Sequence, residues 1–195
     1  FFIASNSTSN YPSATYLALA SVLNMEKINY YSKVIPKGNK SKDRTLPYEM
    51  ITNNKVIQIL KSYGYKYIHF KSGWGPTDTN HNADLNLIGP YDLFLKRLNN
   101  EFYIVLMRST IIREFFITFN LFDGQREMIL FNLDKISQGS MFNSPTFYFA
   151  HILCPHPPYV FTQSGDIPKK VNMNYFGSEW NNKKGFLDQL IFLNK

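Results

Sequence analysis

Three side chains suited to chemistry occupy positions where α/β proteins place working groups: Thr15, Trp74 and His156. His156 lies in a Pro-His-Pro-Pro-Tyr turn at residues 155–159, directly after an apolar run at residues 147–154. Such a run, ended by prolines, predicts a strand buried on both faces. Open α/β sheets bind ligands beyond the carboxyl ends of their strands, where an imidazole can exchange a proton near neutral pH. The alternative is a turn histidine that merely caps a strand.

Thr15 lies at the start of a predicted helix. Residues 16–25 (YLALASVLNM) have the leucine and alanine spacing of a buried helix, and Ser13 is a candidate N-cap. The free backbone N–H groups of a first helical turn attract anions and can orient a hydroxyl toward one. The alternative is that Thr15 is an ordinary helix-start residue.

Trp74 follows another predicted strand, at residues 65–70. Residues 53–63 predict an amphipathic helix that ends at Gly64, and residues 65–70 predict a strand, so this helix–strand unit favours a parallel sheet and an α/β fold. Glycines on both sides of Trp74 let the backbone bend and present the ring as one wall of a ligand pocket. The alternative is a tryptophan that closes over the core. His69, inside the strand, is predicted to be a core or edge histidine.

The rest of the chain supplies helices and a linker. Residues 33–47 predict a basic exposed linker, in which Arg44 is interpreted as part of a solvated surface. Residues 91–98 and 101–119 predict apolar helices, and another helix is expected from about residue 183. Residues 123–138 predict a helix with a buried stripe, made of Ile129, Leu130, Leu133 and Ile136.

Composition narrows the class of protein. The 195 residues contain 44% hydrophobic residues, which indicates a globular domain with a sizeable core. No apolar run reaches the roughly 18–20 residues that cross a bilayer, so we expect no spanning helix here. The net charge of +7 favours an anionic partner, but no nucleic-acid-binding signature accompanies it. Cys154 is the only cysteine, which excludes an intramolecular disulfide.

Three segments together resemble a known family: residues 9–25 (SNYPSATYLALASVLNM), 69–78 (HFKSGWGPTD) and 145–161 (PTFYFAHILCPHPPYVF). They are similar to the sulfatase-like branch of the alkaline-phosphatase superfamily, which includes membrane-anchored sulfatase-like hydrolases and transferases and, more distantly, lipoteichoic-acid synthases. The resemblance implies a three-layer α/β domain with a mostly parallel sheet. It implies a metal-dependent enzyme that attacks a phosphate or sulfate ester through a covalent intermediate.

The resemblance also implies roles for the three candidate residues. Thr15 falls at the position of the family's nucleophile, which also binds a divalent metal ion (Mn, Mg, Ca or Zn). His156 matches the histidine that contacts the ester or donates a proton, and Trp74 falls in the loop that lines the head-group pocket. The Cys/Ser-x-Pro-x-Arg motif of formylglycine sulfatases is missing around Thr15, which favours phosphoryl transfer or phosphodiester cleavage over sulfate-ester hydrolysis.

The same resemblance predicts that residues 1–195 are one incomplete catalytic domain of a longer polypeptide. We expect an acidic metal ligand upstream and an Asp-His pair downstream, and little activity or metal binding in this segment alone. The expected substrate is an anionic ester on a lipid head group or glycan, and the expected location is outside the cytoplasm, tethered to a membrane by other segments. The alternatives are a sulfuric ester hydrolase and a non-catalytic domain that binds anionic glycans or lipids.

Overall fold

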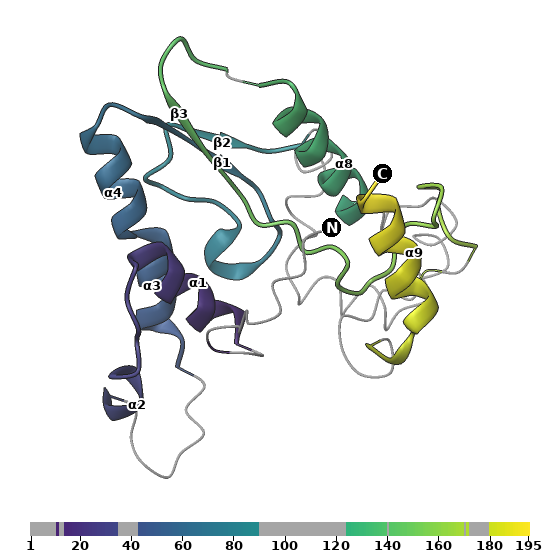
Figure 1. Cartoon of the computed structure of the whole chain (residues 1–195), viewed down its shortest axis with the longest axis horizontal. Coiled ribbons are helices and arrows are strands. Elements are labelled where there is room, and N and C mark those ends of the chain that lie inside the picture. The colour runs from purple at the N-terminus through teal and green to yellow at the C-terminus, as the bar shows by residue number, and fades with distance from the viewer. Residues whose placement is uncertain are drawn as a thin grey trace, which may run out of the picture. The chain divides into compact units, whose positions relative to one another are not determined.

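The computed structural model describes residues 11, 14–34, 43–89, 124–139, 141–169, 171 and 180–195 (Figure 1). The described residues belong to two compact units. The first unit takes its residues from Phe1–His69, Trp74–Asn86 and Ser140–Phe149, and the second from Phe70–Gly73, Leu87–Gly139 and Ala150–Lys195.

A three-stranded parallel sheet confirms the predicted α/β class. Its strand order is β2 (Leu85–Leu87), β1 (Lys66–Phe70), β3 (Thr146–Ala150). The register on one side of β1 is given by Asp84 N–H donating to the Tyr67 carbonyl at 2.9 Å. On the other side, the Tyr67 ring stacks on Phe147 at 5.7 Å and the His69 ring stacks on Phe149 at 5.4 Å.

The strand buried on both faces is β1, not the run at residues 147–154. Residues 67–70 of β1, the central strand, are all buried, so both faces of β1 are covered, whereas every residue of β3 is half-buried. Within the described sheet β3 is an edge strand, and it ends at Ala150 rather than Cys154. The prediction from the apolar run was therefore wrong in burial and in length.

The first unit packs α1 (Thr15–Asn24) against α3 (Thr45–Thr52) and α4 (Lys55–Ser62), with α2 (Tyr31–Val34) in the connection. Its core contains Ala20, Leu23, Ile28 and Ile51. The side chain of Asn54 caps α4 by accepting a hydrogen bond from the N–H of Ile57 at 2.9 Å. Gly64 follows α4 with φ of +83°, a conformation that glycine adopts without strain. The predicted helices at 16–25 and 53–63 are confirmed.

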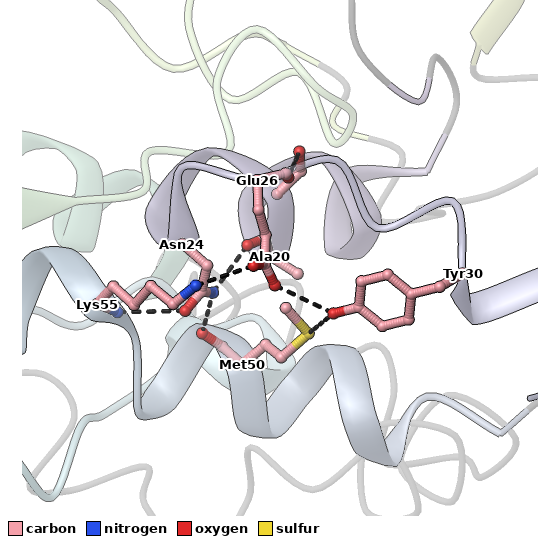
Figure 2. A network of polar contacts seen from close by, with 7 residues as sticks. Ala20, Asn24, Glu26, Tyr30, Met50 and Lys55 are labelled. Carbon is pink, nitrogen blue, oxygen red and sulfur yellow. Dashed lines mark hydrogen bonds and ion pairs between the residues drawn. The ribbon is translucent and has the colours of Figure 1, made fainter.

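A buried asparagine ties these three helices together (Figure 2). The amide nitrogen of Asn24 donates to the carbonyls of Ala20 and Met50, both at 2.8 Å. Its amide oxygen accepts from the backbone N–H of Lys55 at 3.2 Å. Because Asn24 is only 6% exposed, these bonds replace the water that its amide loses on folding.

The second unit is built on α8 (Gly124–Ser137) and α9 (Lys183–Leu193). Ile129 of α8 joins Val160 and Phe161 in a core against which Phe192 of α9 packs. The predicted helices at 123–138 and from about residue 183 are confirmed. The stripe predicted for α8 is wrong in part, since Leu133 and Ile136 are exposed and Asn132 is buried.

Two further predictions concern the linker at residues 33–47 and the apolar helices at residues 91–98 and 101–119. The basic linker predicted for residues 33–47 is wrong at both ends, because α2 extends to Val34 and α3 begins at Thr45, and its residues 35–42 lie outside the described residues. The helices predicted at 91–98 and 101–119 lie outside the described residues. Among the described helices, none is both long and apolar enough to cross a bilayer.

Candidate functional site

Thr15 is the first residue of α1, and its side chain is exposed. The N-cap position is held by Ala14, so the prediction of Ser13 as the cap is wrong by one residue. No side-chain hydrogen bond from the described residues caps α1, and no acidic residue lies in its first turn. The first-turn N–H groups of such a helix carry partial positive charge, which favours an anion beside the Thr15 hydroxyl.

Three aromatic rings and one arginine adjoin the start of α1, and we call them the Tyr48 cluster: Tyr16, Arg44, Tyr48 and Trp74. The Tyr16 and Tyr48 rings meet edge to face with centroids 6.4 Å apart, and the Tyr48 and Trp74 rings are tilted at 6.2 Å. The Arg44 guanidinium lies 4.9 Å above the centre of the Tyr16 ring. This cluster joins α1, α3 and the loop after β1 within the first unit.

The loop that carries Trp74 is fixed by a short 3₁₀ turn, η1 (Gly75–Thr77). The Thr77 N–H donates to the Trp74 carbonyl at 2.9 Å, and Gly75 adopts a φ of +32° close to the Tyr48 ring. Trp74 is half-buried, so part of its ring rests on Tyr48 and part remains accessible. The role of Trp74 as a wall of a ligand pocket stays a prediction.

Arg44 supplies the positive charge of the Tyr48 cluster. A hydrogen bond from Arg44 to the Tyr48 hydroxyl, 3.5 Å long, raises the pKa of Arg44. The neighbouring carboxylate, Asp43, accepts the backbone N–H of Thr45 at 2.9 Å, and its bonds to Thr45 lower the pKa of Asp43. Asp43 therefore stays ionised and is held at the start of α3, where it offsets that helix's own positive end.

The described residues around Thr15 do not fit a divalent metal ion. Divalent ions in proteins are held by carboxylate, imidazole or thiolate ligands, whereas the Tyr48 cluster offers phenol and indole rings and a guanidinium. Among the described residues, no three His, Cys, Asp or Glu side chains cluster in a way that could hold a metal. This donor set suits an anion instead.

His156 belongs to the second unit, whereas Thr15 and Trp74 belong to the first. Its imidazole is exposed and meets the Trp180 ring edge to face at 4.1 Å. Partial burial lowers the pKa of His156, and burial together with the charge of His156 lowers the pKa of His151. The peptide bonds before Pro155 and Pro158 are cis. Thr15 and Trp74 thus belong to one unit, in which the Tyr48 cluster links Trp74 to Tyr16 beside Thr15 in the sequence, and His156 belongs to the other unit.

Two features of the first unit were not predicted from the sequence. Arg44 was assigned to the solvated linker, although the spacing Arg44-x-x-x-Tyr48 places both side chains on one helix face. The second feature is a buried chain of hydrogen bonds in which the Tyr67 hydroxyl donates to Nδ1 of His69 at 2.6 Å and Nε2–H of His69 donates to the Thr77 carbonyl at 2.9 Å. The alternating Tyr67-x-His69 pattern on one strand face was the available signal.

Comparisons of this chain with protein-family models, with curated proteins and with solved structures found no match.

Proposed function

We propose that this chain is part of an enzyme domain that acts on phosphate esters, and that the start of α1 binds the anionic ester group. The observation that carries the proposal is the exposed Thr15 hydroxyl at a helix start without a side-chain cap, one residue from the ring over which Arg44 lies. The α/β class and the resemblance at residues 9–25 support the same function.

In the proposed arrangement, three sets of groups in the first unit have separate roles: anion binding, contact with the organic part of the substrate, and nucleophilic attack. The first-turn N–H groups of α1 and the Arg44 guanidinium bind the ester's negative oxygens. Trp74 and Tyr48 offer ring faces to the organic part of the substrate. Thr15 Oγ1 forms a bond to phosphorus while the bond from phosphorus to the alcohol oxygen breaks, and the proton lost by the Thr15 hydroxyl passes to the departing alkoxide. Attack by water or a second alcohol then releases Thr15, which gives hydrolysis or transfer.

A divalent metal ion remains part of the proposal only through the resemblance, which implies that it would lower the pKa of the Thr15 hydroxyl. Its carboxylate ligands would have to come from outside the described residues, in keeping with the expectation of an acidic residue upstream and an Asp-His pair downstream. The role predicted for His156 as a substrate contact, and the location outside the cytoplasm at a membrane, also stay predictions.

The test measures turnover of bis(4-nitrophenyl) phosphate by the complete protein that contains this chain. Thr15→Ala should reduce turnover by several orders of magnitude, because it removes the nucleophile, while Thr15→Ser should retain part of it. Thr45→Ala is the matched control, since Thr45 is the first residue of another helix in the same unit. Equal turnover in the Thr15→Ala and Thr45→Ala variants would refute the role of Thr15.

The second candidate is a non-catalytic domain that binds anionic glycans or lipids. It is favoured by the composition of the Tyr48 cluster, which contains a guanidinium and aromatic rings but no carboxylate, imidazole or thiolate that could bind a metal ion. In that case the complete protein would bind phosphate esters at the same place, and no variant of Thr15 would alter a turnover that is already zero.

A further inference from the structure

Helix α9 belongs to the second unit and turns polar side chains inward and large apolar side chains outward. This is the reverse of an ordinary amphipathic helix. Two of its polar residues are buried, Asp188 at 7% exposure and Gln189 at 0%. Three of its large apolar residues are exposed: Phe186 at 42%, Leu187 at 51% and Ile191 at 40%. An apolar stripe normally turns toward the core, so this orientation needs a cause.

The cause is a set of specific contacts on the inner side of α9. Gln189 accepts the Val160 N–H at 2.8 Å and donates to the His156 carbonyl at 3.3 Å. Asp188 accepts a hydrogen bond from the Gln163 amide at 2.9 Å and forms an ion pair with Lys184. These bonds satisfy the buried polar groups, and turning the helix over would leave them unpaired at a cost.

Gly185 fixes the same orientation sterically. A Cβ at this position would lie 2.5 Å from the Tyr159 ring, which is itself buried. Only glycine lets α9 approach that ring. Phe192, on the same inner side, stacks on Phe161 at 4.6 Å. Hydrogen bonds, close approach and ring stacking therefore agree on which face of α9 points outward.

The outward face combines apolar and basic residues. At about 100° per residue, positions 186, 187, 190 and 191 lie on one side of the helix together with Lys183 and Lys184. Within α9, all of which is described, the single carboxylate is Asp188, and it lies on the inner side paired with Lys184. An apolar face bordered by lysines and free of carboxylates is typical of helices that lie in the interface of an anionic membrane.

From these contacts we infer that the outer face of α9, consisting of Phe186, Leu187, Leu190 and Ile191 with Lys183, docks on an anionic phospholipid surface. The apolar side chains insert at the level of the acyl boundary, and the Lys183 ammonium group contacts lipid phosphates, while Lys184 remains paired with Asp188. Docking is independent of the proposed function, because α9 belongs to the second unit and the Tyr48 cluster to the first.

Co-sedimentation of the 195-residue chain with vesicles tests this inference. Vesicles of phosphatidylcholine with one quarter phosphatidylglycerol should bind the chain at least tenfold more strongly than pure phosphatidylcholine, and 0.5 M salt should remove most of that preference. The variant Leu187→Ser/Ile191→Ser should lower binding at least tenfold. Since both side chains are exposed, it should fold normally, as circular dichroism would verify.

The matched control is Val22→Ser/Met25→Ser, which removes two apolar side chains of the first unit, each 62% exposed. It should leave vesicle binding unchanged. Failure of the chain to bind anionic vesicles, or equal loss of binding in both double variants, would overturn the inference. A dimer in sedimentation velocity that disappears only in Leu187→Ser/Ile191→Ser would assign the face to a second copy of the chain and would also overturn it.

Discussion

His69 is only 1% exposed and has a hydrogen-bond partner at each ring nitrogen. Because the Thr77 carbonyl can only accept a hydrogen bond, Nε2 carries the proton and Nδ1 accepts from Tyr67. Burial lowers the pKa of His69, and the Thr77 carbonyl and the charge of Asp78 oppose this more weakly. The neutral ring is therefore the form that the folded first unit holds.

The pKa of His69 predicts how stability depends on pH. The unfolded state takes up a proton near pH 6.5, and the folded state does so only at lower pH, so the contribution of His69 is full above that value and falls as the pH drops below it. Urea unfolding at pH 7.5 and pH 5 should show a smaller loss of unfolding free energy in His69→Gln than in the parent chain. An equal or larger loss in the variant would contradict this.

Asn24 gives a second prediction at this scale. Asn24→Ala leaves the Met50 carbonyl and the Lys55 N–H without their partner inside the helix junction (Figure 2). Buried unpaired groups cost about 1–3 kcal/mol each, so the unfolding free energy should fall by about 2–4 kcal/mol in urea titrations. The control is the exposed Asn53, whose side chain accepts a hydrogen bond from the Gln58 amide at 3.0 Å. Asn53→Ala should cost less than about 0.5 kcal/mol, and similar losses in the two variants would refute the role of Asn24.

At the scale of the elements, local signals predicted α1, α4, α8, α9 and β1 but not α3 or β2. The apolar spacing of α1 and the Gly64 stop of α4 are short-range features, and each was read from the sequence. Burial was harder to predict, because it depends on partners far along the chain. The run at residues 147–154 looked like a central strand, yet β3 pairs with β1 on one side only in the described sheet.

In the candidate site, too, local patterns predicted single residues but not the contacts between distant ones. Thr15 and Trp74 were found from local patterns, a helix start and a glycine-flanked ring. The contacts of Tyr48 with Tyr16 and Trp74 were missed because each joins residues about 30 positions apart, and no local period encodes them. Likewise the inverted face of α9 arises from Gln189 and Gly185 meeting residues near position 160, which the helix pattern alone does not reveal.

Two glycines of the second unit give a prediction about packing. Gly185→Ala drives a Cβ to within 2.5 Å of the buried Tyr159 ring, so the unfolding free energy should fall by about 1–3 kcal/mol. At Gly89, a Cβ would meet the Phe131 ring at an ordinary 3.5 Å, and the φ angle is not in the left-handed region. Gly89→Ala should therefore be neutral or slightly stabilising. Thermal unfolding of both variants measures the difference, and equal midpoints would contradict the close approach of α9.

At the scale of the whole molecule, the chain has a net charge of +7, and its basic residues have different surroundings in the two units. In the first unit Arg44 faces aromatic rings at a helix start, and in the second unit Lys183 and Lys184 border an apolar face. Both arrangements suit anionic partners, a phosphate ester in one case and a lipid surface in the other. The two can be tested separately, because no residue belongs to both.

The proposed function depends above all on the binding of an anionic ester by the start of α1 and the Tyr48 cluster. Calorimetric titration of the 195-residue chain with glycerol 1-phosphate at low salt tests this binding most directly. We expect saturable binding that Arg44→Ala weakens about tenfold or more, because a charge-assisted contact is lost. Lys27→Ala, which removes an exposed positive charge elsewhere in the first unit, should weaken it less than about twofold. Absence of saturable binding, or an equal effect of both substitutions, would contradict the proposal.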